Sequence, residues 1–287
     1  MVPFLPLLGS GYDAAVYLPG VTVLVRGVGD IGSAVAHRLF GEGCAVVMHD
    51  DAKPATTRRG MAFADAAFEG HAVLEGVTAA RVNTLDGVKA ALLAHTVVPL
   101  YVRDWGPLLA VIQPAVLVDA RMRKHAAPEV QAGYAGLTIA LGPDLVAGRH
   151  ADVVVETAWE GLGAVITQQG ASRPLAGEPR MIGGHARDRY VYAEAEGIFG
   201  TAARIGDIVR RGQVIAEIGG IVGVPAPLDG VLRGLTHDGA LVTVGTKVVE
   251  VDPRGPDGQV RGIAERPRRI AEGVLSAIRD WTPQPGK

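Results

Sequence analysis

Apolar residues occur along the chain in short runs that end in polar residues, and the first clear run covers residues 21–25. A second run follows at 45–48, and the segment between them, 33–40, has the composition of a helix. Further apolar runs lie at 97–102, 115–119, 137–141 and 153–156. Apolar strands that alternate with helices predict a parallel sheet wound by helices on both faces.

Two helices are predicted with more detail. Residues 84–95 form the clearest candidate, with Asn83 or Thr84 available as the N-cap and an apolar stripe made of Leu85, Val88, Leu92 and Leu93. Residues 263–281 predict an amphipathic helix near the end of the chain, with an apolar side made of Ile270, Val274, Leu275 and Ile278. That side would leave apolar area in water if the helix stood alone, so we expect it to pack onto the body of the protein.

A duplicated pattern of glycines and short β-type segments runs from about Tyr190 to Asp252. Gly197 recurs as Gly230, and the segments 206–212 and 217–218 recur at the same spacing as 239–245 and 250–251. Two similar halves predict a small all-β domain, which resembles the barrel-sandwich hybrid of biotinyl and lipoyl carriers. Those carriers hold a lysine at a hairpin tip, whereas the junction 219–227 has none. A docking or shape-giving module is therefore expected in place of a swinging-arm carrier.

These patterns predict an α/β chain: a Rossmann-like doubly wound parallel sheet, then a small all-β barrel-sandwich-hybrid-like domain and a C-terminal helix. The predicted segments are an N-terminal extension (1–20), the dinucleotide-binding domain (21–167), a linker or site loop (168–189), the duplicated β domain (190–255) and the C-terminal helix and tail (256–287). The extension lacks the basic start and long apolar core of a secretory signal, so we expect it to be loosely held.

A glycine-rich turn joins the first predicted strand to the first predicted helix. Its residues are Gly27, Val28, Gly29, Asp30, Ile31 and Gly32. The first glycine permits the tight turn, the second lets the backbone approach a pyrophosphate, and the third lets the helix pack closely on the strand. This spacing is weak by itself in a glycine-rich chain, but its strand–turn–helix context predicts a dinucleotide site at the start of the helix.

Polar residues at the ends of other strands extend the predicted cofactor site. Asp50 follows the second strand, where such folds place an acid on a ribose hydroxyl; the other interpretation is a solvated strand end. Three basic residues either reach a phosphate of the dinucleotide or cap the surface: Lys53, Arg58 and Arg59. The carboxyl ends of later strands complete the site with Asp119, Arg121, Gly142 and Pro143, next to the loop 168–189.

Composition narrows the class of protein. A net charge of -2 gives no basic field for nucleic acid, and no apolar stretch reaches the 18 or so residues that a membrane helix needs. The single cysteine, Cys44, excludes an internal disulfide, and the eight histidines show no metal-binding spacing. We therefore expect a cytoplasmic protein with no metal site, no nucleic-acid partner and no membrane partner; a homo-oligomer stays open.

Several motifs together cover nearly the whole chain from residue 21. They are 25–32, Lys53-Pro54 with Arg58-Arg59 and Ala62-Phe63, 118–121, 140–143, Glu156-Thr157, 206–216 and 229–234. In combination they resemble the YqeB-type accessory proteins of selenium-dependent molybdenum hydroxylase systems. The resemblance implies a role in maturing or inserting a modified molybdopterin cofactor, with the hydroxylase as client enzyme. Residues 158–164 depart from that family, because its Arg-Gly-His stretch is missing there.

Two main hypotheses of function follow. Molybdopterin cytosine dinucleotide has a pyrophosphate and a ribose, so the glycine turn and Asp50 would suit it in a cofactor-handling protein. The alternative is an NAD(P)-dependent oxidoreductase, although no Tyr-x-x-x-Lys or His-Asp constellation for hydride transfer stands out. A weaker third hypothesis is chalcogen transfer through a persulfide on Cys44, which otherwise is a small packed apolar residue. Whether the protein catalyses a reaction stays open.

Overall fold

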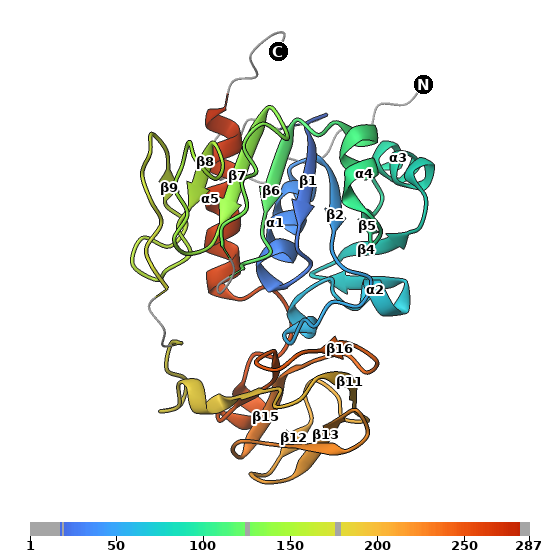
Figure 1. The fold of residues 1–287 in the computed structure, drawn as a ribbon, viewed down its shortest axis with the longest axis vertical. Helices are drawn as coiled ribbons and strands as arrows, with labels where there is room; N and C mark the ends of the chain where they lie inside the picture. Colours follow the sequence, from blue (N-terminus) through green and yellow to red (C-terminus); the bar gives the residue numbers. More distant parts are fainter. Residues whose placement is uncertain (1–17, 19, 124–126, 176–178, 282–287) are drawn as a thin grey trace, which may run out of the picture.

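The computed structural model describes residues 18, 20–123, 127–175 and 179–281, which form a mixed α/β fold (Figure 1). The predicted N-terminal extension lies almost wholly outside these residues, as do three residues of the predicted loop 168–189 and the last six residues of the chain.

A nine-stranded sheet forms the larger part of the molecule, in the order β3-β4-β5-β2-β1-β6-β7-β8-β9. The strands from β4 to β8 in this order run parallel, whereas the edge pairs β3–β4 and β8–β9 are antiparallel. The strands are β1 (Thr22–Arg26), β2 (Ala45–His49), β3 (His71–Leu74), β4 (Val77–Val82), β5 (Val98–Tyr101), β6 (Val116–Asp119), β7 (Leu137–Leu141), β8 (Val153–Val155) and β9 (Val165–Ile166). The predicted parallel sheet thus forms the centre of a larger sheet whose two edges are antiparallel.

Each apolar run that predicted a strand forms one, namely β1, β2, β5, β6, β7 and β8. The interior residues of these strands are buried, because helices cover both faces of the sheet. The antiparallel hairpin of β3 and β4 was not predicted. Its side chains are mostly half-buried or exposed, so it lacks the continuous apolar run that marks the central strands.

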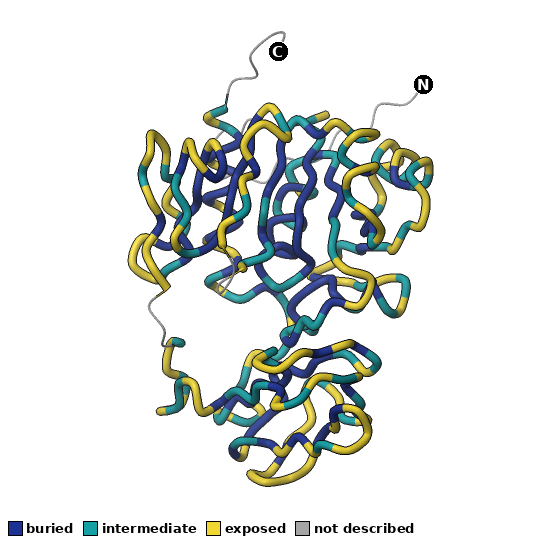
Figure 2. The backbone as a smooth tube through the Cα atoms, in the orientation of Figure 1, coloured by how far each residue is buried: buried dark blue, intermediate teal, exposed yellow. Residues whose placement is uncertain are grey.

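Helices pack on both faces of this sheet. On one face, α1 (Asp30–Gly41) lies against α5 (Glu265–Asp280), and the other face carries α3 (Leu85–Ala94) and α4 (Trp105–Ile112). Because successive side chains of a strand point to opposite faces, Val23 and Val25 join the core under α1 and α5, whereas Leu24 joins the core under α3 and α4. Figure 2 shows this burial in the central strands and in the helices beside them.

The two predicted helices are present. Of the two predicted N-cap candidates, Thr84 caps α3 by accepting a hydrogen bond from the Gly87 N–H at 3.1 Å. The predicted stripe is wrong at Leu93, which is 88% exposed, because it lies one residue beyond Leu92 and so faces away from the sheet. In α5, all four predicted apolar residues are buried.

Residues 190–252, called the β module below, form two four-stranded sheets with a core of their own. The sheet orders are β10-β17-β15-β12 and β14-β13-β11-β16. The strands are β10 (Tyr190–Tyr192), β11 (Gly197–Gly200), β12 (Ile208–Val209), β13 (Val214–Ile218), β14 (Val222–Pro225), β15 (Gly230–Leu235), β16 (Leu241–Val242) and β17 (Lys247–Asp252). The two sheets correspond strand for strand, and φ is nearly equal at Gly197 (159°) and Gly230 (155°) and at Gly212 (82°) and Gly245 (84°).

Short elements connect the α/β part to the β module. A 3₁₀ turn, η1 (Arg59–Met61), and the four-residue helix α2 (Ala66–Glu69) follow β2, and η1 lies against β15. The other 3₁₀ turns are η2 (Arg187–Arg189) and η3 (Gly255–Asp257), at the two ends of the β module. Figure 1 shows the β module below the large sheet.

Within the described residues, no helix is both long enough and apolar enough to cross a membrane.

Close backbone packing generates a first prediction about α5. A Cβ at Gly273 would lie 2.2 Å from the Gly163 carbonyl oxygen, so we expect Gly273→Ala to lower the free energy of unfolding by about 1–3 kcal/mol through overpacking. The control is Gly41→Ala at the end of α1, where a Cβ meets nothing within 4 Å and alanine favours the helix. Urea denaturation of both variants measures this. Equal stability of the two variants would contradict the packing of α5 on the Gly163 loop.

Candidate functional site

The glycine turn between β1 and α1 holds its shape because two of its glycines touch other backbone. Gly27 has φ +110°, and a Cβ there would lie 2.8 Å from the Ala120 carbonyl carbon and oxygen at the end of β6. A Cβ at Gly32 would lie 2.0 Å from the Gly27 carbonyl oxygen. Neither position can hold a larger residue without a backbone shift. The third glycine, Gly29, differs: nothing lies within 4 Å of the place where its Cβ would be.

Gly29 is the N-cap of α1, and it makes no side-chain cap for the helix. Among the described residues, we find no acceptor for the backbone N–H groups of Gly29 and Asp30. The next N–H, of Ile31, donates to the Asp30 Oδ1 at 3.0 Å. Free N–H groups and the positive end of the helix dipole make this a place that favours an anion, with open space in front of Gly29.

Asp50 lies at the end of β2 and contacts the glycine turn directly. Its Oδ2 accepts a hydrogen bond from the Val28 N–H at 2.6 Å, and its Oδ1 accepts one from the Asp51 N–H at 2.8 Å. Burial raises the pKa of this carboxyl above its ordinary value. Each carboxylate oxygen can accept more than one hydrogen bond, so Asp50 retains capacity for ribose hydroxyls while it braces the turn.

The three basic residues that follow β2 have different surroundings and partners. Lys53 is exposed. Arg58 donates through Nε and Nη2 to the two carboxylate oxygens of Glu250, at 2.7 and 3.1 Å, and through Nη1 to Asp30 at 3.1 Å. Arg59 pairs with Asp65 and donates to the Leu235 carbonyl oxygen at 2.7 Å. Arg58 and Arg59 therefore join the α/β part to the β module, a role that neither interpretation of the sequence included.

Asp119 and Arg121 form a tight pair at the end of β6. Arg121 donates through Nε and Nη2 to the two oxygens of Asp119, at 2.8 and 2.6 Å, and Nη2 also reaches Glu129 at 2.8 Å. Glu129 and Gln131 accept further hydrogen bonds from the Arg26 guanidinium, each at 3.0 Å. Arg121 thus has carboxylate partners already, so any ligand phosphate would have to compete with them for it.

Arg26 lies at the end of β1, the central strand that has β2 on one side and β6 on the other. It is 5% exposed and lies over the Trp105 ring, 3.8 Å from the ring centroid. Its Nε and the Nε2 of Gln131 are buried donors for which the described residues supply no acceptor. Burial acts to raise the pKa of the neighbouring Glu129, but the hydrogen bonds and charges of Arg26 and Arg121 outweigh it and lower the pKa to about 2.

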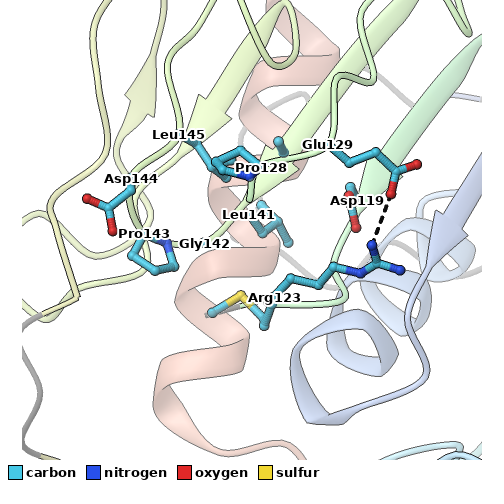
Figure 3. Close-up of a pocket in the computed structure, with 11 residues that line it drawn as sticks. Asp119, Arg123, Pro128, Glu129, Leu141, Gly142, Pro143, Asp144 and Leu145 are labelled. Carbon is cyan, nitrogen blue, oxygen red and sulfur yellow. Dashed lines mark hydrogen bonds and ion pairs between the residues drawn. The ribbon is translucent and has the colours of Figure 1, made fainter. Parts of the chain in front are cut away.

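Gly142 and Pro143 line a small hollow beside Asp119, Arg123 and Glu129 (Figure 3). Its volume is about 70 Å³, whereas pockets for drug-sized ligands usually enclose roughly 300–1,000 Å³. The hollow has room for a small group and not for a whole dinucleotide. The structure therefore brings Gly142 and Pro143 next to Asp119, at the same sheet edge as the glycine turn.

Charged residues of the β module and of α5 also act on the glycine turn, and no sequence motif pointed to them. The Glu250 side chain is fully buried. Its carboxylate accepts hydrogen bonds from Arg58 and Arg189, and the Lys247 Nζ lies 3.4 Å from its Oε2. Arg266 of α5 donates through Nε to the Thr157 carbonyl oxygen at 2.9 Å. Burial acts to raise the pKa of Asp30, but the charges of Arg58, Lys247 and Arg266 outweigh it and lower the pKa.

The sequence repeat contains a signal for these residues. Glu250 corresponds to Glu217, which is exposed, and Lys247 corresponds to Val214. The buried setting of Glu250, in contrast to the exposed Glu217, comes from the α/β part, which supplies Arg58 to Glu250. Comparison of the two copies position by position would have included Lys247 among several positions with a charge in one copy only.

Cys44 is fully buried, and burial raises the pKa of its thiol to about 11. A thiol of this kind is rarely ionised near neutral pH, which counts against the persulfide hypothesis. Within the described part of the chain, no three His, Cys, Asp or Glu side chains gather in a group that would hold a metal ion.

The fold and the site define a mixed α/β protein whose glycine turn is open to an anion. No protein-family model matches the chain. The chain is 39% identical over 259 residues to an uncharacterized protein, YqeB, of Escherichia coli (strain K12), in a match that covers 89% of this chain and 47% of that protein. The chain thus spans about half the length of this curated relative. The similarity supports a YqeB-type protein over the shared region.

Solved structures give only distant matches. The ectoine utilization protein EutE (DoeB) from Ruegeria pomeroyi, in its product-bound form, matches 81% of this chain and 85% of its own, at 14% identity and a TM-score of 0.24. A succinylglutamate desuccinylase from Silicibacter sp. TM1040 matches the same shares at 13% identity and a TM-score of 0.24. Likeness at this level carries no conclusion about fold or function.

The Glu129 network generates a prediction about pH. Because the folded-state pKa of Glu129 is about 2, below its ordinary value of 4.5, the ionised carboxylate stabilises the folded protein above pH 4.5. We expect Glu129→Gln to lower the free energy of unfolding by about 1–2 kcal/mol at pH 7, a figure reduced for the partial exposure of the carboxylate. The difference from the unsubstituted protein should shrink as the pH falls from 4.5 towards 2.

Urea denaturation at a series of pH values measures this difference. Glu160→Gln is the control, since Glu160 is exposed and should show little effect at any pH. A stability loss in Glu129→Gln that stays constant down to pH 2.5 would show that charge pairing at Glu129 does not contribute.

Proposed function

We propose that this protein binds a dinucleotide on the glycine turn and serves as an accessory protein in maturing, or inserting, the cofactor of a selenium-dependent molybdenum hydroxylase. The proposed ligand is molybdopterin cytosine dinucleotide or a related form. The similarity to YqeB supports the type of protein, and the sequence motifs named above imply the link to the hydroxylase.

The observation that carries the binding proposal is the contrast among the three glycines. Gly27 and Gly32 lack side chains because backbone lies against them, whereas nothing in the protein lies against Gly29. A glycine that internal packing does not require, at a helix N-terminus with free N–H groups, suits the close approach of a ligand. A pyrophosphate is the group that this geometry favours.

The order of the parallel strands agrees with this proposal. Strands β5, β2, β1, β6, β7 and β8 follow the spatial order 3-2-1-4-5-6 of Rossmann dinucleotide-binding folds, counted along the chain without the β3–β4 hairpin. In such folds the ligand lies where the strand order reverses, which here is between β1 and β6. The glycine turn follows β1, and Asp119 ends β6, so both would flank a ligand at that point.

Asp50 would bind a ribose of the ligand. Its carboxylate has remaining acceptor capacity and favours a free 2′-hydroxyl over a 2′-phosphate, which would bring a second negative charge close to it. The cytidine ribose of molybdopterin cytosine dinucleotide and the adenosine ribose of NAD both offer that hydroxyl. The glycine turn and Asp50 would therefore suit NAD as well as molybdopterin cytosine dinucleotide. The experiments below distinguish the accessory role from the oxidoreductase alternative.

Replacing Gly29 tests the dinucleotide site. We expect Gly29→Val to fold normally, because its φ of -64° suits any residue and the space is open, and to weaken dinucleotide binding at least tenfold, or about 1.4 kcal/mol. Gly41→Val on the same helix is the matched control and should bind normally. Binding is measured by calorimetry with purified molybdopterin cytosine dinucleotide and, separately, with NAD. Normal binding by Gly29→Val would remove the glycine turn from the site.

Mass spectrometry of small molecules released from the purified protein tests the identity of the ligand. We expect a pterin dinucleotide, at a lower amount in Gly29→Val than in Gly41→Val. Release of NAD or NADP without a pterin would favour the oxidoreductase.

The accessory role is tested by producing a client hydroxylase without this protein, with it, and with Gly29→Val or Gly41→Val in its place. We expect the unsubstituted protein and Gly41→Val to raise the molybdenum content and activity of the client, and Gly29→Val to leave both near the level without the protein. Equal molybdenum and activity in all four preparations would contradict the maturation role.

A further inference from the structure

We propose that Arg26 and His49 form a base-recognition site beside the glycine turn, which binds the hydrogen-bonding edge of a cytosine ring. Arg26 would donate to the carbonyl oxygen and the ring nitrogen of that edge, and His49 would accept from its amino group. This inference rests on the proposed dinucleotide function and names the side chains that would select the base of the ligand.

The two residues are neighbours at the carboxyl edge of the large sheet. Arg26 is the last residue of β1 and His49 the last residue of β2, and the parallel register pairs them directly. Neighbouring strands lie about 4.8 Å apart. Leu24 and Val47, two residues earlier in each strand, face α3 and α4. Because strand side chains alternate between the two faces, Arg26 and His49 point to that same face.

Each of these residues directly precedes a proposed anchor of the dinucleotide. Gly27, which starts the glycine turn, follows Arg26, and Asp50 follows His49. The Gly27 N–H donates to the His49 carbonyl oxygen at 2.8 Å, which connects the two strand ends. A ligand with its pyrophosphate on the turn and a ribose on Asp50 would bring its base to this part of the sheet edge, since the base is bonded to that ribose.

His49 offers one hydrogen-bond acceptor. Its Nε2 lies 2.7 Å from the Arg103 carbonyl oxygen, and a carbonyl oxygen can only accept, so Nε2 carries the ring proton. In the neutral ring Nδ1 is then an acceptor, and no donor among the described residues reaches it. This nitrogen is also open to solvent, since it is not one of the buried polar atoms that lack a partner.

The surroundings of His49 favour the neutral ring. Burial lowers the pKa of His49 below 6.5, and the charge of Arg26 acts in the same direction. The hydrogen bond to Arg103 and the charges of Asp50 and Asp51 act the other way and do not reverse the shift. A histidine with a lowered pKa is mostly neutral near pH 7, so Nδ1 keeps its lone pair for an N–H group of the ligand.

Arg26 offers donors that are already held in place. Its guanidinium lies over the Trp105 ring, and Nη1 donates to Glu129 and Gln131, each at 3.0 Å. The Nη2 group has no acceptor among the described residues, and it is open to solvent, whereas Nε is buried. A side chain that is restricted before the ligand arrives loses less freedom on binding.

Cytosine is the base whose edge complements this pair of residues. Its edge carries two neighbouring acceptors, the O2 oxygen and the N3 nitrogen, and then the N4 amino donor. The N–H bonds of the Arg26 Nη2 suit the two acceptors, and the His49 Nδ1 suits the donor. Guanine has the opposite count of donors and acceptors, and adenine has no oxygen for the guanidinium.

Uracil is the base that this arrangement would reject most clearly. The glycine turn and Asp50 would hold the pyrophosphate and the ribose in one orientation, so uracil would place its O4 oxygen where cytosine places its amino group. Two acceptors, O4 and the His49 Nδ1, would then face each other without a proton between them. A site built to hydrogen-bond one group rejects an analogue that leaves its polar atoms unpaired.

The first test compares nucleoside diphosphates by calorimetry on the full chain at one salt concentration and one pH. Cytidine diphosphate and uridine diphosphate carry the same diphosphate and ribose and differ only in the base. We expect the unsubstituted protein to bind cytidine diphosphate at least tenfold more tightly, because only cytosine pairs with both residues. Equal affinity for the two, or binding of adenosine diphosphate as tight as that of cytidine diphosphate, would overturn the inference.

Variants of His49 separate its two ring nitrogens. His49→Gln keeps a donor for the Arg103 carbonyl oxygen and removes the acceptor at Nδ1, so it should weaken cytidine diphosphate about tenfold and uridine diphosphate less than about twofold. His49→Asn places an amide oxygen near the position of Nδ1 and should recover part of the affinity. Arg26→Lys should weaken both probes, since both offer O2 to the guanidinium. The matched control is His71→Gln on β3, which is exposed and should leave both affinities unchanged.

Thermal unfolding of each variant shows whether the fold is kept. Cytidine diphosphate binding that His49→Gln leaves unchanged, or weakens no more than it weakens uridine diphosphate, would overturn the base site. Equal affinities for the two probes that both fall in Gly29→Val would also overturn it and leave the dinucleotide proposal standing. A preference for cytidine diphosphate that depends on His49, with a client hydroxylase that does not respond to this protein, would support the base site and contradict the accessory role. Absence of cytidine diphosphate binding by the unsubstituted protein would overturn the inference as well.

Discussion

The ion pair between Arg58 and Glu250 is the interaction on which the arrangement of this molecule depends. Glu250 lies in β17 with no exposed side chain, so its charge is stabilised only by the cations around it. Loss of one partner of such a buried pair typically costs about 3–5 kcal/mol, since the other charge stays buried. Arg58 also pairs with Asp30 at the start of α1. One side chain thus connects the glycine turn to the β module, and a change at the turn can reach the module through it.

Close backbone contacts at glycines fix the position of the glycine turn and of strands β15 and β17. Gly27 packs on the backbone at Ala120, which ties the glycine turn to the end of β6, and Gly230 packs on the Asp252 carbonyl oxygen, which ties β15 to β17. Added atoms at such positions have no space, because protein interiors are packed to nearly crystalline density. Gly29 is not packed in this way, because nothing lies within 4 Å of the place where its Cβ would be. The same turn therefore contains two glycines that the packing of the fold requires and a third, Gly29, that it does not.

The two copies of the β module differ in the surroundings of their charged residues. Its two sheets correspond strand for strand, and both copies contribute to one apolar core. Charge breaks the correspondence: Glu217 is exposed to water in one copy, whereas its counterpart Glu250 is buried among cations in the other. Carboxylates and guanidinium groups need partners when they are buried, and the α/β part supplies Arg58 for that purpose. The asymmetry follows from which sheet meets the rest of the molecule.

The sequence by itself determined the local structure: the central strands, the start of α3 next to Asn83 or Thr84, the apolar side of α5 and the spacing of the repeat. These features depend on hydrophobic periodicity and turn chemistry, which act over a few residues. The glycine turn and Asp50 were also predictable, because consecutive elements of a parallel sheet bring them to one edge. Only the tertiary structure decided that Arg58 and Arg59 join the β module and that Arg26 pairs with Glu129. It alone placed Lys247 and Arg266 beside Asp30. Charged groups find partners across hundreds of residues, and no periodicity along the chain records which carboxylate each cation will meet.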